Sequence, residues 1–431
     1  MNQRKIYRPL AMRTIENYQI QYLARKYDFS KESRIAHLLV KRINQALMET
    51  EKLVGITRVK PFELYIKKHR SKIKLPLFKP EYLEPIYQGK TFKASRKLVR
   101  KACLQALRES FPEITDKKML SIIDPWALAR KKGPTRYCDE LKTITTAYDE
   151  KDTAGWHQLI DRIRPELPAE RMETPDISAP EELVQELTAM VSLETGLGKT
   201  VARHLVEEVI TLRNLCCPRV DNLKSGEMPL LVTHVRAHLS EEIATRFRRL
   251  APVIITVWKP EEMKKTPHNV PDSLNLLKKR IIRVCFEAYR QNGLLTLMEL
   301  QWVFQISSAR VSELIRSFQN EHNIIVPTPG TILDAGRSMT HKDIIVKLHL
   351  EGYSVSEISR ITHHSPRAVD NYVGTFEAVL ILHLYDLPTQ LMARLLQKGI
   401  TLINEYLKLI ERYYQDKKDI KNYLLAQGVK F

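Results

Sequence analysis

The clearest structural signal in the chain is the stretch GYSVSEISRITHHSPRAVDNYV at residues 352–373. Ser354 and Glu357 have the spacing of a capping box, which predicts that a helix begins there. Ser365 can cap a second helix, with Pro366 at its first position, where the missing N–H does no harm. Both helices contribute to a small predicted core: Ile358, Ile361, Val369, Tyr372 and Val373. The stretch therefore predicts two helices of a trihelical helix-turn-helix unit.

A less polar copy of this unit follows 34 residues later, where Leu348-His-Leu350 recurs as Leu382-His-Leu384. The equivalent pairs continue through the unit: Ile358 and Met392, Arg360 and Arg394, Ile361 and Leu395, Val369 and Ile403, Tyr372 and Tyr406, Val373 and Leu407. We expect Asp386 to cap the first helix of the copy and residues 397–399 to form its turn. This period also occurs in helical-repeat arrays, but two copies are too few for a stable array. The more apolar copy is suited to packing on a partner.

Residues 272–335 predict a winged helix-turn-helix. Apolar periodicity predicts three helices, at residues 273–291, 297–304 and 309–321. Gly293 is expected to end the first helix, and Ser307 or Ser308 to cap the third. Residues 323–332 predict two short strands around a turn, which would form the wing. The alternative is a winged-helix scaffold that contacts proteins.

The second helix of a helix-turn-helix pair enters the major groove, where Arg can bind guanine through two hydrogen bonds. The residues expected on the outer faces of the two candidate recognition helices are therefore predicted base contacts: Arg310, Ser312, Glu313, Arg316, Arg367, Asp370 and Asn371.

Nearly all of the excess positive charge lies in the first quarter of the chain. The 431 residues include 69 Lys and Arg against 50 Asp and Glu, a net charge of +19. Residues 1–110 hold 26 of these basic residues and 9 of the acidic ones, and the rest of the chain is close to neutral. Such an excess favours a polyanionic partner, with nucleic acid ahead of an anionic membrane surface.

The basic residues concentrate in residues 67–74, which alternate like a strand, and in residues 93–101, which have helical periodicity. In the helix, Leu98, Cys103 and Leu107 are expected to lie inward. Interspersed tyrosines (65, 82 and 87) are typical of surfaces that stack bases while following phosphates. The predicted phosphate contacts, helix caps included, are Lys67, Lys68, Arg70, Lys72, Lys74, Lys93, Arg96, Lys97, Arg100, Lys101, Ser308, Ser365 and His364. The alternative is a solvated basic face with core tyrosines.

The remaining segments predict a mainly α fold of α+β type. Helices are expected at residues 12–26, with a stripe of Ile35, Leu38, Leu39 and Ile43 on a second helix at 31–49. Further helices begin at Glu181 and near Val201, joined by a glycine turn at 196–198 that lacks the spacing of a phosphate-binding loop. Strands are expected at 229–235, ending near His234, and at 253–258. The predicted organisation is 1–110 basic helical and extended region, 111–180 Pro-rich connector, 181–265 α+β module, 272–335 winged unit, 340–411 tandem units and 412–431 tail.

Several of these segments resemble one family. They are LAPVIITVWKPEE (250–262), GLLT (293–296), IIVPTPG (324–330), MTHKDIIV (339–346) and the stretch at 352–373. Together they are similar to the bacterial and archaeal proteins catalogued as domain of unknown function sixteen-seventy, over roughly residues 180–411, and residues 7–45 resemble the family's N-terminus. The resemblance implies helix-turn-helix DNA binding, often in mobile or multi-copy genetic contexts. The family's usual Pro-Thr-Arg-Gly reads Pro-Thr-Pro-Gly here, so a wing arginine is missing.

Composition excludes other classes of protein. The longest apolar runs fall well short of the roughly 20 residues that a membrane span needs, and no secretory signal opens the chain, so we expect a cytoplasmic protein with no membrane partner. The five cysteines are odd in number and form no CxxC pair, which favours buried thiols. His234 and His238 are expected to be structural. No cofactor or metal is expected.

The leading hypothesis is a sequence-specific double-stranded DNA-binding protein, a regulator or accessory factor of a mobile element. Helix-turn-helix units would contact bases and the basic N-terminal region would contact phosphates. The alternative is an RNA-binding or ribonucleoprotein component whose helix-turn-helix units dock DNA or proteins. An enzyme is not expected, because no nuclease or recombinase spacing of acidic residues or tyrosines occurs. Other copies of the chain or other subunits are further candidate partners.

Overall fold

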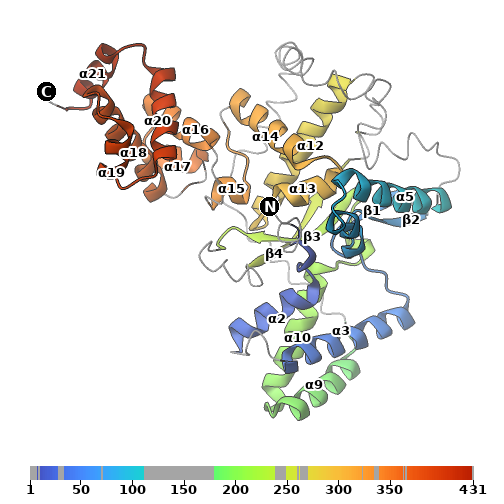
Figure 1. The fold of residues 1–431 in the computed structure, drawn as a ribbon. Helices are drawn as coiled ribbons and strands as arrows, with labels where there is room; N and C mark the ends of the chain where they lie inside the picture. Colours follow the sequence, from blue (N-terminus) through green and yellow to red (C-terminus); the bar gives the residue numbers. More distant parts are fainter. Residues whose placement is uncertain are drawn as a thin grey trace. The chain divides into compact units, whose positions relative to one another are not determined.

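The structure is a computed structural model that describes residues 10–27, 34–68, 71–110, 179–237, 249–259, 270–322, 324–333, 339–362 and 366–429, with residues 7, 262 and 364. These residues are mainly helical, with small antiparallel sheets, as the sequence predicts (Figure 1). The chain divides into two compact units. The first comprises residues 1–315 and 327–329, and the second comprises residues 316–326 and 330–431.

Four helices of the first unit pack around one apolar cluster: α2 (Ile15–Lys26), α3 (Arg34–Val54), α9 (Glu181–Thr195) and α10 (Lys199–Cys216). The cluster joins residues that are far apart in the sequence, so α2 and α3 pack against α9 and α10 (Figure 1). The buried amide of Gln19 bonds Asn44 and donates to the carbonyl oxygen of Val209 at 2.9 Å. These bonds satisfy polar groups that would be costly to bury alone.

The buried stripes of these helices have the predicted period, but two residues predicted at the edge of the α3 stripe are exposed. Leu39 and Ile43 are buried as predicted, whereas Ile35 is 49% exposed and Leu38 is 44% exposed. The buried stripe of α3 instead includes Ala36, and the helix packs against α9 and α10. Between α9 and α10 the predicted glycine turn is confirmed, since Gly196 has a φ of 71° and caps α9.

A three-stranded sheet has the order β4-β3-β5, with β3 at Glu227–His234, β4 at Leu250–Thr256 and β5 at Gly293–Leu294. The predicted strand pair is confirmed, and β3 ends at His234 as expected. A 3-10 turn, η4 (Val220–Asn222), precedes β3. The long helix α12 (Val270–Arg290) packs on β4 and contacts β5.

Residues 63–110, which contain both of the densest basic stretches, form a hairpin followed by short helical turns and a long helix. Strands β1 (Glu63–Lys68) and β2 (Ser71–Pro76) pair antiparallel, followed by η1 (Pro80–Leu83), α4 (Glu84–Tyr87) and α5 (Phe92–Ser110). Helix α5 packs on β2 through Cys103 and Leu107, which are buried. Leu98 is exposed, so its predicted inward position is wrong; Ser95 and Val99 occupy the buried stripe instead.

The second and third helices predicted for the winged unit are present as α13 (Leu297–Phe304) and α14 (Ser308–His322). Gly293 does not end the preceding helix. That helix stops at Arg290, Asn292 takes the positive φ of 60°, and Gly293 lies in β5. A Cβ on Gly293 would lie 2.5 Å from Val232, so the residue's lack of a side chain serves sheet packing instead.

The predicted wing is wrong. Residues 324–328 form no strand, and α15 (Pro329–Ile332) follows as one helical turn. The backbone N–H of Val326 donates to the side-chain oxygen of Gln319 at 3.0 Å, and Thr331 Oγ1 donates to the Val326 carbonyl oxygen. Side chains therefore satisfy the backbone groups that a strand partner would have bonded.

The second unit contains six further helices: α16 (Met339–Leu350), α17 (Val355–Thr362), α18 (Pro366–Leu384), α19 (Thr389–Leu395), α20 (Ile400–Tyr413) and α21 (Lys417–Ala426). Helices α16, α17 and α18 contact one another and share a core with Ile358, Val369 and Val373. The predicted capping box is confirmed, because Ser354 N donates to Glu357 at 2.8 Å and Glu357 N donates to Ser354 Oγ.

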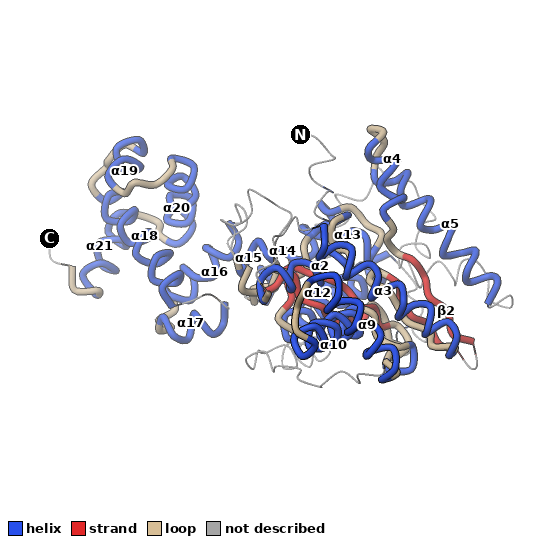
Figure 2. Tube along the Cα trace, turned by 90° about the horizontal axis from the view of Figure 1, so that it is seen from below, coloured by secondary structure: helices blue, strands red, loops and turns tan. Residues whose placement is uncertain are grey.

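The copy of the unit packs on a second cluster with α18 and α21 (Figures 1 and 2). Its cap differs from the prediction: Pro388 precedes α19, and Asp386 instead has a φ of 56° and pairs with Lys417. Helix α21 lies within residues 412–431 and buries Ile420 and Leu424 in the same cluster. The apolar second helix of the copy, α20, is thus occupied by contacts within its own unit.

No helix among the described residues is long and apolar enough to cross a membrane. The four described cysteines are free and buried, as predicted for thiols, and burial raises the pKa of Cys103 to about 12. Cys138 lies outside the described residues.

Candidate functional site

Helix α18 presents predicted base contacts on one face. Arg367, Asp370 and Asn371 are exposed in its first two turns, and Asp370 and Asn371 lie three and four positions after Arg367, which places both beside it on the helix. Val369 and Val373, on the opposite side, are buried against α16 and α17. The buried positions set the rotation of α18 and leave these three polar side chains outward.

Helix α14 brings its predicted contacts together less well. Ser307 Oγ accepts from the backbone N–H of Arg310 at 3.3 Å and so acts at the start of the helix. The Arg310 guanidinium pairs with Glu313 at 2.9 Å, which engages two of the predicted base contacts with each other. Ser312 is half-buried and Arg316 is exposed. Val311, Leu314, Ile315 and Phe318 are buried as predicted.

The lysines of α5 form an exposed stripe. Lys93, Lys97 and Lys101 recur every four residues and are all exposed, so their ammonium groups follow one side of the helix. Arg96 turns inward instead and donates to the carbonyl oxygen of Gln305 at 3.1 Å. Arg100 is half-buried. We call Lys93, Lys97 and Lys101 the α5 lysine stripe.

The hairpin supplies fewer outward cations than predicted. Lys67 is exposed and Lys72 pairs with Asp221 at 2.6 Å, whereas Lys74 donates to the carbonyl oxygen of Arg58 at 3.0 Å. The side chains of Lys68, Arg70 and Ser365 lie outside the described residues.

Two predicted phosphate contacts have structural roles. His364 is 5% exposed, and its Nδ1 lies 2.8 Å from the carbonyl oxygen of Thr362, so it is wrongly predicted to face phosphate. Ser308 is half-buried, and its backbone N–H donates to Gln301 at 3.0 Å. Both residues hold the turns before the second helices.

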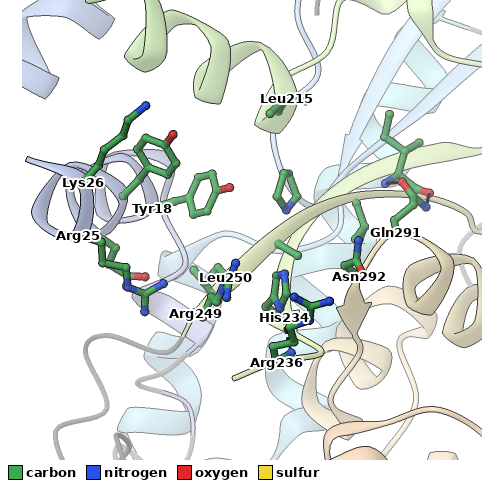
Figure 3. Close-up of a pocket in the computed structure, with 16 residues that line it drawn as sticks. Tyr18, Arg25, Lys26, Leu215, His234, Arg236, Arg249, Leu250, Gln291 and Asn292 are labelled. Atoms are coloured by element: carbon green, nitrogen blue, oxygen red, sulfur yellow. Dashed lines mark hydrogen bonds between the residues drawn. The ribbon is translucent and has the colours of Figure 1, made fainter. Parts of the chain in front are cut away.

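A basic groove that the sequence did not reveal lies between α2 and the β3–β4 strand ends. Its volume is about 880 Å³, and Figure 3 shows Tyr18, Arg25 and Lys26 of α2 on one side and Arg249, His234 and Arg236 on the other. We call it the α2–β4 groove. No Asp or Glu is among its described lining residues. Its cations come from three segments, so only the Tyr18, Tyr22, Arg25 spacing on α2 could have indicated it.

The groove has a positive electrostatic character. Burial, together with the guanidinium groups of Arg249, Arg236 and Arg25, lowers the pKa of His234 to about 4. The imidazole is therefore neutral at neutral pH. Its Nδ1 accepts from the backbone N–H of Arg236 at 2.9 Å, which places the remaining proton on Nε2. Burial also raises the pKa of Tyr18, which keeps its hydroxyl uncharged.

No group of three or more His, Cys, Asp or Glu within the described ranges is placed to hold a metal ion. His349 instead lies 3.1 Å from Glu377 and 2.9 Å from the Tyr423 hydroxyl, contacts that join α16, α18 and α21. Its surroundings are those of a structural histidine.

A family model described as "Protein of unknown function (DUF1670)" matches residues 193–409. The match runs from the end of α9 to α20 and agrees with the resemblance expected over residues 180–411. The expected likeness of residues 7–45 lies outside the matched range. No curated protein and no solved structure matches the chain.

Proposed function

The chain belongs to the family described as DUF1670, and from its geometry we propose that it is a sequence-specific double-stranded DNA-binding protein. Helix α18 would contact base edges in the major groove, and the α5 lysine stripe would contact phosphates. The observation that carries the proposal is the exposed face formed by Arg367, Asp370 and Asn371 at the start of α18.

The packing of α16, α17 and α18 supports this role. A trihelical helix-turn-helix unit needs its second paired helix fixed by a core and its early residues outward. The capping box at Ser354 begins α17, Pro366 begins α18, and Val369 and Val373 anchor α18 on the shared cluster. Arg can bind guanine and Asn can bind adenine through paired hydrogen bonds, so this face offers chemistry for distinguishing bases.

The role proposed for α14 is secondary. Its Arg310 must leave Glu313 before it can bind a base, and the missing wing removes the groove contact that a winged unit would add. Arg316 is exposed on the same helix. We therefore assign α14 to supplementary contacts and α18 to base recognition.

The α5 lysine stripe supports phosphate contact. Residues four apart on a helix are separated by about 6 Å along its axis, so the three ammonium groups span roughly 12 Å. Charges spaced along a line can each displace a counterion from a nucleic acid backbone. The proposal thus separates the source of affinity from the source of specificity.

The test is a selection of randomised duplex DNA on the full-length protein at near-physiological salt, followed by sequencing of the bound pool. An enriched motif supports the proposal. Retention of duplex with no motif would contradict sequence-specific recognition. Competition by structured and single-stranded RNA on the same protein tests the RNA-binding alternative. If RNA displaces the bound duplex at a lower concentration than unlabelled duplex does, the RNA-binding alternative is favoured.

A further inference from the structure

We propose that the α2–β4 groove is a binding site for a nucleoside phosphate. The phosphate would lie against Arg25, Arg236 and Arg249, which Figure 3 shows, and the base would lie against Tyr18 and Tyr22. The proposal concerns the first unit alone and does not rest on DNA recognition by α18. A free nucleotide and one nucleotide of a single strand present the same chemistry to this groove.

Strand pairing brings two of the arginines together. Arg236 follows the end of β3 and Arg249 precedes the start of β4, and these ends are adjacent in the antiparallel pair. The backbone N–H of His234 donates to the carbonyl oxygen of Arg249 at 2.9 Å, which fixes this arrangement. Within the described ranges, neither guanidinium has a carboxylate partner. An anion entering the groove would therefore meet concentrated positive charge.

Helix α2 supplies a third arginine and the aromatic wall. Tyr18, Tyr22 and Arg25 lie four and three positions apart, so they share one face of the helix. Lys26 is already occupied by Glu208, which also accepts from the Tyr27 hydroxyl at 2.9 Å. Arg25 and Arg249 both act on His234 and on Tyr18: both guanidinium groups add to the lowering of the His234 pKa and oppose the rise that burial causes in the Tyr18 pKa. The charges from the two walls thus converge on one place.

The groove also has polar and apolar contacts suited to a base and sugar. Neutral His234 carries a proton on Nε2 and can donate a hydrogen bond. Leu250 and Leu215 add apolar surface to the lining of the groove. The volume of about 880 Å³ falls in the usual range for small-molecule sites, and aromatic rings stack on any base because every base has a π face.

The edge of β4 argues against an extended peptide as the ligand. Pro252 has no N–H to offer, and the Gln291 side chain accepts from Ile254 N at 2.9 Å and donates to Ile254 O at 2.7 Å. The backbone groups that a peptide strand would pair with are thus absent or occupied. Side chains, not the strand edge, must recognise the ligand.

Titration calorimetry on the full-length protein tests the proposal with four probes: adenosine 5′-monophosphate, adenosine, inorganic phosphate and a short deoxyadenosine single strand. We expect the monophosphate to bind more tightly than adenosine or phosphate. Arg249→Gln and Tyr18→Leu should each weaken it about tenfold, because each removes a charged or stacking contact. Arg203→Gln, a surface arginine of α10 that pairs with Glu181, is the matched control and should bind normally.

Comparing the affinities of the single strand and the monophosphate distinguishes single-stranded nucleic acid from a free nucleotide as the ligand. Tighter binding of the single strand than of the monophosphate assigns the groove to single-stranded nucleic acid, and the reverse assigns it to a free nucleotide. Arg236→Gln gives a second test if Tyr18→Leu lowers the melting temperature. The proposal is overturned if neither the monophosphate nor the single strand binds, or if inorganic phosphate binds as well as the monophosphate. It is also overturned if the groove variants bind the monophosphate as tightly as the control variant does. Loss of a duplex motif in α18 variants would leave these results unchanged.

Discussion

The Tyr406 hydroxyl donates a hydrogen bond to the backbone carbonyl oxygen of Tyr372 at 3.4 Å, and the two tyrosines occupy equivalent positions of the 34-residue repeat. Tyr406 belongs to α20 and is 1% exposed, with its ring 6.4 Å from that of Phe376 on α18. The second copy therefore packs Tyr406 against α18, the helix that carries the proposed base contacts. The apolar residues of the copy stabilise α18 through this packing.

Replacing Tyr406 should destabilise the second unit mainly through lost packing. We expect Tyr406→Ala to lower the free energy of unfolding by about 3–4 kcal/mol, as for other buried aromatic truncations. Tyr406→Phe should cost about 1 kcal/mol or less, because the hydrogen bond is long. Urea unfolding followed by circular dichroism measures both. Equal losses in the two variants would contradict a packing role for the ring.

Gly293 should tolerate no side chain. A Cβ there would lie 2.5 Å from Val232 and 2.6 Å from Val253, so Gly293→Ala is expected to cost about 1–3 kcal/mol. Gly374→Ala is the control, since it lies in α18 with nothing within 4 Å and should stabilise by about 0.5–1 kcal/mol. Thermal unfolding of the two variants should show shifts of opposite sign. A harmless Gly293→Ala would contradict the close sheet contact.

Stability should fall as the pH is lowered through the titration of His234. Burial, with Arg249 and Arg236, lowers its pKa from 6.5 to about 4 in the folded protein. The unfolded chain takes up the proton near pH 6.5 and the folded protein only near pH 4, so stability is lost across this window as the pH falls. After allowance for partial exposure we expect a loss of about 1–2 kcal/mol. The urea midpoint of His234→Gln should vary less with pH than that of the wild type. An equal pH dependence in the two proteins would show that this histidine is not the source of the effect.

The α5 lysine stripe should set part of the salt dependence of DNA binding. Changing Lys93, Lys97 and Lys101 to Gln should make the slope of log K against log salt shallower by up to about 2.7, which is three phosphates at 0.9 each. The control replaces three lysines of the second unit: Lys398, Lys408 and Lys418. Fluorescence anisotropy over a salt series gives both slopes. Equal slopes for the stripe variant and the wild type would remove α5 from the interface.

Helices were predictable from the sequence because their signals are local. The capping box at Ser354, Pro366 at the start of α18 and the buried positions Val369 and Val373 lie within one short segment. The wing was not predictable, since a β-branched run such as residues 324–326 has strand propensity whether or not a partner strand exists. Here Gln319 satisfies Val326 N, which only the tertiary structure reveals.

In the candidate sites, too, features set by local sequence were predictable and features set by tertiary contacts were not. The exposed face of α18 followed from helix periodicity, but the inward turn of Arg96 depends on the Gln305 carbonyl oxygen, which lies far away in the sequence. The α2–β4 groove joins α2 with residues beside β3 and β4, so no local motif marks it. Charge counts located the basic segment of the sequence but could not tell which of its cations face solvent.

The most direct test of base recognition by α18 compares randomised-duplex selections on wild type, Asn371→Ala, Arg367→Ala and Arg394→Ala. Arg394 is the control, an exposed arginine on α19 of the same unit. Asn371→Ala and Arg367→Ala should each lose preference at individual base positions, at a cost of about 1–3 kcal/mol for the preferred duplex, while Arg394→Ala keeps the wild-type motif. An identical motif in all four proteins would contradict the account.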